Sequence, residues 1–205
     1  MIEDCVSPRN LARRDGEIRY IEHFMAKDEA DVLLDRLRGE LDWREESIVI
    51  AGRAIKVPRL VCWYGEPGAR YRYSGVDHEP LPWTESLRAL RRRVEELCGG
   101  CFNSVLGNLY RDGGDSLGWH SDKEKELGPE PLIASLSFGA ERRFELRHGK
   151  SREILNLPLG HGSLLLMGGV LQHHWRHRIP RMPGVREPRI NLTFRAILPG
   201  AERSP

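Results

Sequence analysis

The second half of the chain consists of short apolar runs separated by turn residues, and this pattern constrains the fold more than any other feature. Six runs of five to nine residues follow Cys101, and pairs such as Gly113-Gly114 and Gly128-Pro129 interrupt them. Many short strands with frequent turns are typical of a β-sandwich, a barrel or a jelly roll. We expect strands at residues 104–110, 132–138, 143–147, 153–157, 163–167 and 190–198.

The first half contains two helical patterns that predict a brace for this β core. Leucines recur at every fourth position of residues 27–41, which places them on one helical face. A second helix is expected between the N-cap residue Thr84 and Gly99-Gly100, which end it. Arginines between residues 88 and 93 fall mostly opposite its apolar side, and a solvated face is favoured there over a phosphate-binding stripe.

The composition indicates a globular chain without a membrane segment. Of the 205 residues, 40% are apolar and 30% are charged, and no run approaches the roughly 18 apolar residues of a membrane helix. Residues 1–14 contain no apolar segment of the kind found in secretory signals. We therefore expect a monomer in the bacterial cytoplasm, or in the nucleus if the organism is eukaryotic. The formal charge of +2 does not by itself indicate a nucleic-acid binder.

His120-Ser121-Asp122 is the first candidate for a metal site. Side chains at positions i and i+2 of an extended strand point to the same side, so one imidazole and one carboxylate can reach a single ion. A third ligand is available downstream from His173, His174 or His177, which we expect at the end of a strand. Two histidines and one carboxylate leave three coordination positions open, which suits iron(II) with oxygen and a bidentate co-substrate. Taken alone, the short motif is also explained by a surface histidine beside a turn aspartate.

The segment Arg189–Arg195 predicts an anion site near that metal. Along a strand its apolar residues face one side, and the other side carries Arg189, Asn191, Thr193 and Arg195. Two guanidinium groups that face inward are costly unless anions meet them. A small dicarboxylate fits, because the arginine fork binds carboxylates through two hydrogen bonds. Structural bridges from these arginines to Asp or Glu are the alternative.

Taken together, these motifs resemble the AlkB family of nucleic-acid dealkylases. The resemblance rests on His120-x-Asp122, on His177 in Trp175-Arg176-His177, and on Arg189-x-Asn191-x-Thr193-Phe194-Arg195. It extends from about residue 57 to residue 199 and is strong between Phe102 and Ala140. It implies a mainly β (α+β) fold with a double-stranded β-helix, or jelly-roll, core braced by N-terminal helices. We expect a flexible arm at residues 1–16, one AlkB-like dioxygenase domain at 17–200, a nucleotide-recognition region at about 47–80 and the β-helix core at about 101–198.

The resemblance also implies the reaction and its ligands. It implies Fe(II) as the metal and 2-oxoglutarate and O2 as co-substrates, with aldehyde, succinate and CO2 as products of oxidative demethylation. The implied iron ligands are His120, Asp122 and His177, because family members carry a histidine shortly after a tryptophan, and His173 and His174 remain rivals. Binding of 2-oxoglutarate is assigned by the resemblance to Arg189 and Arg195, helped by Asn108 and Tyr110, with Asn191 and Thr193 nearby.

On the substrate side, Tyr71-Arg72-Tyr73 resembles the family segment that receives a flipped base. We expect Tyr73 to stack on the base and Tyr71 to bond its edge, and the alternative is two tyrosines packed in a sheet. Glu124 matches a family acidic residue that meets the exocyclic amino group of adenine or cytosine. Trp63 is expected either at the pocket entrance or in the core. An aromatic and acidic pocket suits cationic lesions such as 1-methyladenine and 3-methylcytosine.

Two departures from the duplex-specialised members of the family favour single-stranded DNA or RNA as the partner. Those members carry a bulky aromatic at a hairpin tip, and the matching stretch here is Ile50-Ala51-Gly52. They also carry a basic triplet where this chain has only scattered charge between Arg181 and Arg186. Two other functions stay open: a dioxygenase of the same chemistry that acts on protein or a small molecule, and a catalytically silent nucleic-acid-binding module.

Overall fold

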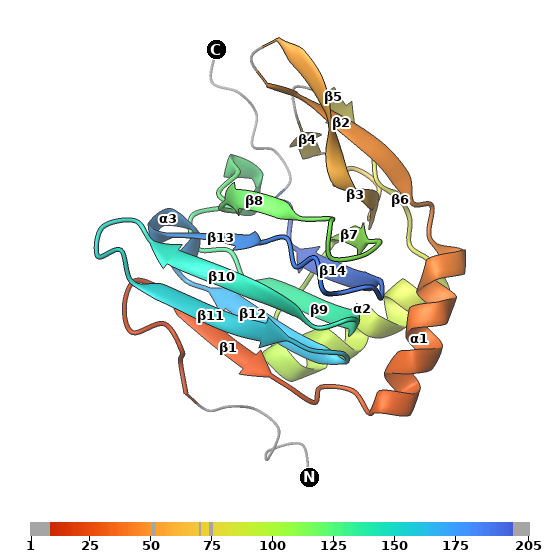
Figure 1. The fold of residues 1–205 in the computed structure, drawn as a ribbon, viewed down its shortest axis with the longest axis horizontal. Helices are drawn as coiled ribbons and strands as arrows, with labels where there is room; N and C mark the ends of the chain where they lie inside the picture. Colours follow the sequence, from red (N-terminus) through yellow and green to blue (C-terminus); the bar gives the residue numbers. More distant parts are fainter. Residues whose placement is uncertain (1–8, 51, 70, 74–75, 199–205) are drawn as a thin grey trace.

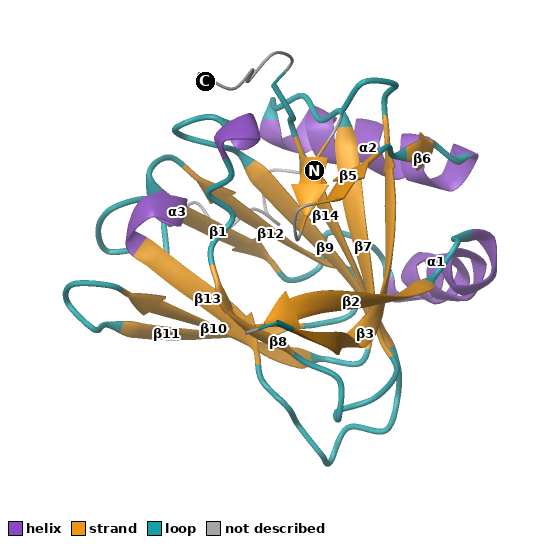
Figure 2. Cartoon of the chain, turned by 90° about the horizontal axis from the view of Figure 1, so that it is seen from above, coloured by secondary structure: helices purple, strands orange, loops and turns teal. Residues whose placement is uncertain are grey.

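The computed structural model describes most of the chain. The described residues are 9–50, 52–69, 71–73 and 76–198, and no side chain is described for residues 48–50, 71–73 and 76–78. Two twisted antiparallel sheets face each other, and two helices lie on the outer side of the larger sheet (Figures 1 and 2). Among the described residues, no helix has both the length and the apolar character needed to cross a membrane.

The larger sheet has eight strands. Its order is β1-β12-β9-β14-β7-β3-β2, and β6 pairs with β3 in parallel. The strands are β1 (Glu17–Ile21), β2 (Arg44–Ile50), β3 (Arg53–Gly65), β6 (Leu81–Pro82), β7 (Ser104–Tyr110), β9 (Ile133–Gly139), β12 (Ser163–Gly168) and β14 (Arg189–Arg195). β14 lies in the middle of the sheet between β7 and β9, and its side chains point alternately toward the helices and toward the smaller sheet. This position explains why nearly the whole strand is buried.

The smaller sheet has four strands in the order β11-β10-β13-β8. Its members are β8 (Leu117–His120), β10 (Arg142–His148), β11 (Ile154–Leu159) and β13 (Trp175–Ile179). A separate hairpin joins β4 (Tyr71–Tyr73) to β5 (Val76–His78) and lies near the end of the β2–β3 hairpin in Figure 1. The two facing sheets confirm the predicted jelly roll, and strands occur at all six predicted positions.

The second of the two long helices begins and ends for the reasons that the sequence indicated. The helices are α1 (Lys27–Glu40) and α2 (Glu85–Cys98), with the short α3 (Leu171–His174) and the 3-10 turn η1 (Lys125–Leu127) later in the chain. Oγ1 of Thr84 accepts the backbone N–H of Leu87 over 3.2 Å at the start of α2. Gly99 ends this helix with a left-handed conformation at φ 66°, which a residue with a side chain adopts at a cost.

Apolar side chains form one core on each side of the larger sheet. The outer core lies between that sheet and the helices, and it contains Ile190, Leu192 and Phe194 from β14 together with Leu87 and Val94 from α2. The inner core lies between the two sheets and contains Phe144, Leu146, Leu165 and Trp175 among others. Because strand side chains alternate, the polar residues of β14 are turned toward the space between the sheets.

Part of the segment that was expected to be a loose arm is packed in this structure. Within residues 9–16, the backbone N–H of Leu11 donates to Ile18 over 2.8 Å, and Ala12 is buried. The indole N–H of Trp175 donates to the carbonyl oxygen of Arg14 over 3.2 Å. These contacts hold residues 9–16 against the β core, and residues 1–8 lie outside the described part of the chain.

Candidate active site

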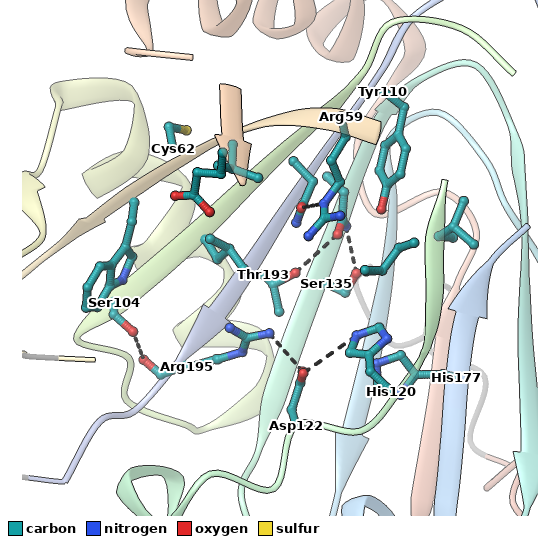
Figure 3. A pocket seen from close by; sticks show the side chains of 18 of the residues that line it. Arg59, Cys62, Ser104, Tyr110, His120, Asp122, Ser135, His177, Thr193 and Arg195 are labelled. Carbon is teal, nitrogen blue, oxygen red and sulfur yellow. Dashed lines mark hydrogen bonds and ion pairs between the residues drawn. The ribbon is translucent and has the colours of Figure 1, made fainter. Parts of the chain in front are cut away.

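A cavity of about 320 Å³ opens between the two sheets. It is lined by all the predicted site residues whose side chains the structure describes. β3, β7 and β14 of the larger sheet form one wall, and β8 and β13 of the smaller sheet form the other. Figure 3 shows the polar side chains that converge there. The larger sheet supplies Arg59, Tyr110, Thr193 and Arg195, and the opposite side supplies His120, Asp122 and His177.

Three predicted ligands meet on one side of this cavity. His120 is the last residue of β8, Asp122 follows it, and His177 lies in β13 directly opposite His120. Their candidate ligand atoms all lie within 4.8 Å of one another. Nε2 of His120 is 3.8 Å from Oδ1 of Asp122. We call these three residues the pocket cluster.

The ring nitrogens of the pocket cluster are suited to bind a cation. Nδ1 of His120 donates to the carbonyl oxygen of Gly118 over 2.9 Å, so Nε2 of the neutral ring carries the lone pair. Nδ1 of His177 is buried and has no hydrogen-bond partner among the described residues. A buried polar atom without a partner is costly unless a metal or ligand meets it. Two imidazoles and a carboxylate therefore fit iron(II).

Electrostatics keep the pocket cluster in the protonation state that a metal needs. Burial, together with the charge of the neighbouring His120, lowers the pKa of His177 to about 3. Burial also acts to raise the pKa of Asp122, but the charges of Arg195, His177 and His120 outweigh it and hold this pKa at about 2. At neutral pH His177 is therefore neutral and Asp122 ionised, which are the forms that bind metals.

The position of Asp122 differs from the sequence prediction. The i and i+2 argument assumed that both residues lie on one strand, but β8 ends at His120 and residues 121–124 form no helix or strand. Asp122 is instead held by side chains from elsewhere in the chain. Its backbone N–H donates to Oε1 of Gln172 over 2.9 Å, and its Oδ2 accepts from Nη2 of Arg195 over 2.9 Å.

Arg189 and Arg195 both reach the cavity, but their partners differ. Arg195 bridges to Asp122, as the alternative interpretation of the sequence anticipated. Arg189 is 1% exposed, and its Nη2 donates to Oγ of Ser137 over 2.9 Å. Its Nε and Nη1 are buried without an acceptor among the described residues, and burial lowers its pKa to about 10. A guanidinium with an open edge fits a carboxylate such as an end of 2-oxoglutarate.

Tyr110 lies between two buried arginines, one of which the sequence did not reveal. Its ring centroid is 5.3 Å from the guanidinium carbon of Arg189 and 5.3 Å from that of Arg142. Arg142 donates to the backbone carbonyls of Asp112, Asp115 and Pro180 over 2.7 to 3.0 Å. Arg142 thus holds the surrounding loops together and adds positive charge behind the end of the cavity where Arg189 lies.

Asn108, Asn191 and Thr193 lie on the larger sheet and are buried. Oδ1 of Asn108 accepts from Nε of Arg59 over 2.5 Å, which leaves its amide N–H groups for a further acceptor. Thr193 donates to Oδ1 of Asn191 over 3.1 Å, and the Asn191 amide donates to Oγ of Ser135 over 2.7 Å. Arg59 was not anticipated, although a lone arginine within the largely apolar run 57–64 is a usable signal.

The expected base-binding residues are described only in part. Trp63 lines the cavity and also packs against Ala69, Leu127 and Ile197. Glu124 lines the same cavity. In the β4–β5 hairpin Tyr71 pairs with His78 and Tyr73 with Val76, but the side chains of Tyr71 and Tyr73 lie outside the described residues. Ala51 of the Ile50-Ala51-Gly52 turn and the side chain of Ile50 also lie outside them.

The two rival histidines lie elsewhere, because residues 171–174 form the helical turn α3 and not a strand end. Nε2 of the exposed His173 donates to the carbonyl oxygen of Pro129 over 2.6 Å. His174 belongs to a second group whose candidate ligand atoms lie within 4.8 Å, formed with Asp15 and His148. We call these three residues the anchor cluster.

The anchor cluster is not prepared for a metal. Nδ1 of His148 accepts the backbone N–H of Ser151 over 2.9 Å, so the proton of the neutral ring must reside on Nε2. That Nε2–H group points to Oδ2 of Asp15 at 3.0 Å. A protonated nitrogen offers no lone pair to a cation. The hydrogen bond from His148 to Asp15 therefore holds the N-terminal segment to the end of β10.

Comparisons with known proteins agree with this geometry. Residues 17–195 match the family described as "2OG-Fe(II) oxygenase superfamily". Alpha-ketoglutarate-dependent dioxygenase alkB homolog 3 of Homo sapiens is 43% identical over 213 residues, which cover 99% of this chain and 72% of that protein. DNA oxidative demethylase ALKBH2 of Mus musculus is 42% identical over 209 residues, covering 96% and 87% of the two chains.

A solved structure gives independent support for the fold alone. The structure of OsALKBH1 superposes with a TM-score of 0.65 and covers 90% of this chain and 99% of its own, at 16% sequence identity. The family match, the identity to the relatives and the grouping of His120, Asp122 and His177 beside a buried arginine all point the same way. The chain belongs to the 2OG-Fe(II) oxygenase superfamily and, within it, to the AlkB homologues.

Proposed function

We propose that this Fe(II)- and 2-oxoglutarate-dependent dioxygenase demethylates N-alkylated bases of nucleic acid, of the 1-methyladenine and 3-methylcytosine type. One observation carries the proposal: a single cavity holds the pocket cluster together with the open edge of Arg189. The names of two relatives, an alpha-ketoglutarate-dependent dioxygenase and a DNA oxidative demethylase, support this chemistry and this class of substrate.

We assign the metal to His120, Asp122 and His177. Bound iron(II), with O2 and 2-oxoglutarate, supplies the oxidation of an N-methyl carbon, after which formaldehyde, succinate, CO2 and the unmodified base are released. Arg195 stabilises the ionised form of Asp122 through their 2.9 Å hydrogen bond. The burial of Asp122 and His177 excludes water from this side of the site.

We assign the 2-oxoglutarate site to the neighbouring face of the larger sheet. Arg189 offers two buried donors to a carboxylate, and the Tyr110 ring packs beside its guanidinium. Asn108 contributes amide N–H groups, because its oxygen is already bonded to Arg59. Asn191 and Thr193 bond to each other and to Ser135, so their role in our proposal is to form an ordered floor. Arg195 lies at the other end of β14 from Arg189 and bonds to Asp122.

The substrate base would enter from the side of the cavity where Trp63 and Glu124 lie. A base must leave the stack to reach the metal, and stacking on an aromatic side chain lowers the cost of that step. We propose Tyr73 as the stacking residue, Tyr71 and Glu124 as partners of the base edge, and Trp63 as part of the entrance. A cationic methylated base is attracted both to aromatic rings and to the Glu124 carboxylate.

We further propose that single-stranded DNA or RNA is preferred over duplex. The support comes from the sequence, since Ile50-Ala51-Gly52 offers no aromatic wedge and the charges between Arg181 and Arg186 are scattered. A protein without a wedge has nothing to fill the gap that a flipped base leaves in a duplex. A single strand requires no such replacement.

Mass spectrometry of methylated oligonucleotides tests the proposal. Single- and double-stranded oligomers that contain 3-methylcytosine or 1-methyladenine are incubated with the protein, Fe(II), O2 and 2-oxoglutarate. We expect the oligomers to lose one methyl group for each succinate formed, faster in the single strand. Succinate formation without demethylation would instead favour a protein or small-molecule substrate. Oligonucleotide binding without any succinate would favour a catalytically silent binding module.

A further inference from the structure

We propose that Gln172 is a positioning residue for the metal site, because it fixes the backbone of Asp122 and thereby the carboxylate ligand. The inference rests on the proposed role of the pocket cluster as the metal site. It concerns a residue that carries no recognisable motif, since Gln172 stands directly before His173-His174 as an ordinary polar residue.

The backbone around Asp122 has no sheet to hold it. β8 ends at His120, and the residues from Ser121 to Glu124 lie in neither a helix nor a strand. The backbone N–H of Asp122 donates to Oε1 of Gln172 over 2.9 Å. An N–H group can only donate, so the oxygen of the amide and not its nitrogen must face Asp122. This contact takes the place of the ladder hydrogen bond that a longer strand would supply.

The surroundings of Gln172 give this contact its significance. The side chain is 2% exposed, and its Nε2 meets only the sulfur of Met167, at 3.8 Å, among the described residues. A thioether is a weak acceptor, so one end of the buried amide is poorly satisfied. Burying such an amide is less favourable than burying an apolar side chain of the same size. Fold stability alone therefore gives no reason for an amide here, whereas the bond to Asp122 does.

Gln172 also stands on a firmly packed element. The preceding Leu171 is 1% exposed, and a Cβ built on Gly16 would lie 2.6 Å from its Cα, so the N-terminal segment presses directly on α3. α3 leads without a gap into β13, which carries His177. Gln172 therefore ties the segment that carries the aspartate ligand to the segment that carries the distal histidine ligand.

Two contacts thus hold Asp122 at different points. Arg195 holds the carboxylate of Asp122, and Gln172 holds the backbone nitrogen of the same residue. Without Gln172, the carboxylate would still pair with Arg195, but the loop between β8 and η1 could shift relative to His120 and His177. We expect weaker metal binding and a less uniform coordination geometry, with little change in the fold.

Titration of the metal-free protein with Co(II), followed by visible absorption, tests this inference without measuring turnover. Gln172→Met keeps the size of the side chain and removes the acceptor, and we expect Co(II) affinity to fall about 10- to 100-fold with an altered absorption band. Gln172→Glu keeps an acceptor oxygen at the same reach and should stay within about threefold of the wild type. His173→Gln, in the same helical turn, is the matched control and should leave the affinity unchanged.

The thermal midpoint of the metal-free variants separates positioning from folding. We expect Gln172→Met to fold with a midpoint lower by only about 2 to 4 °C per kcal/mol lost, because the buried N–H of Asp122 loses its acceptor. If that variant does not fold, Gln172→Asn carries the test, because it keeps the amide but is one methylene too short to reach Asp122. Wild-type affinity in the folded variant, or equal losses in it and in His173→Gln, would overturn the inference. Equally weak Co(II) binding by the wild type and Asp122→Ala would instead contradict the proposed metal site itself.

Discussion

Two clusters in this fold contain the same kinds of side chain at close range, yet only one is prepared for a metal. The pocket cluster and the anchor cluster each combine two histidines with one aspartate, and in each the candidate ligand atoms lie within 4.8 Å of one another. They differ in the hydrogen bond that Nδ1 of one histidine in each cluster makes. His120 donates from Nδ1 to a carbonyl, whereas His148 accepts at Nδ1 from a backbone N–H.

This difference decides where the lone pair lies. In His120 the donation from Nδ1 leaves Nε2 unprotonated and turned toward Asp122. In His148 the acceptance at Nδ1 places the proton on Nε2, which donates to Asp15. Two histidines and one aspartate therefore form a candidate metal site in the cavity and a structural clamp at the N-terminal segment. Residue identity and proximity alone do not identify a metal site, because the tautomer of each histidine decides which ring nitrogen can bind a cation.

The comparison predicts its largest effect on turnover. Asp122→Ala should lower succinate formation by at least ~100-fold, because it removes a ligand and leaves the Arg195 guanidinium buried without its partner. Asp15→Ala, the corresponding change in the anchor cluster, should leave turnover within about twofold. Both variants are assayed with Fe(II), 2-oxoglutarate and a methylated oligonucleotide. Comparable losses in the two variants would remove the distinction between the clusters.

The next effect concerns Arg189, the buried arginine that lines the same cavity. Arg189→Ala should raise the KM for 2-oxoglutarate about 100-fold, because the open edge of a buried guanidinium is lost. Arg195→Ala should weaken both 2-oxoglutarate and Co(II) binding, since Arg195 is bonded to Asp122. His174→Gln in the anchor cluster serves as the control for both. An unchanged KM in Arg189→Ala would place the co-substrate elsewhere.

Metal-dependent stability separates the clusters without any chemistry. Co(II) at about 1,000 times its dissociation constant should raise the free energy of unfolding by about 4 kcal/mol in the wild type and in His174→Gln. Asp122→Ala should show almost none of this stabilisation. Thermal melting with and without Co(II) measures the difference. Loss of the stabilisation in His174→Gln would mean that the anchor cluster takes part in metal binding.

Burial of the pocket cluster also predicts a pH dependence of the metal-free protein. The pKa of His177 lies near 3 in the folded protein and near 6.5 in the unfolded chain, so only the unfolded chain takes up this proton as the pH falls between these values. The free energy of unfolding should therefore decrease by up to ~1.4 kcal/mol per pH unit below about 6.5. Urea unfolding at pH 7 and pH 5 measures this, and His177→Gln should show a flatter profile.

The smallest effect belongs to the anchor cluster. Asp15→Ala should lower the free energy of unfolding by about 1 kcal/mol, because it removes the acceptor of His148, and the 42% exposure of the Asp15 side chain limits the value of the bond. Urea unfolding measures this loss of stability, and Glu22→Ala, a change at an exposed residue, is the control. A loss of Co(II) binding in Asp15→Ala would show that the clamp interpretation is wrong.

Local patterns were enough to predict the frame of this protein. Alternation along a strand predicted that Arg189 and Arg195 face the cavity while Phe194 faces the helices, and the structure confirms both orientations. Thr84 and Gly99 marked the ends of α2 correctly. These features depend on neighbouring residues in the chain, which is why a single sequence contains them.

Long-range contacts were beyond such patterns. Asp122 lies beyond the end of β8 and is held by Gln172, 50 residues away. The i and i+2 argument brought His120 and Asp122 together, but it did not include this long-range contact. Residues 171–174 were predicted to be a strand end, but they form the helical turn α3. His174 in this turn belongs to the anchor cluster, whereas His177 in β13 belongs to the pocket cluster. Neither the burial of Arg142 nor the tautomers of the histidines follow from spacing. Arg142 is buried by hydrogen bonds across the fold, whereas each tautomer depends on the exact geometry of a local hydrogen bond.

Anomalous diffraction at the cobalt edge, from crystals of the full chain grown with Co(II), tests the central claim most directly. The account predicts one strong peak within bonding distance of Nε2 of His120, the Asp122 carboxylate and the His177 ring. It predicts no peak between Asp15, His148 and His174. A peak in the anchor cluster, or none beside Asp122, would contradict it.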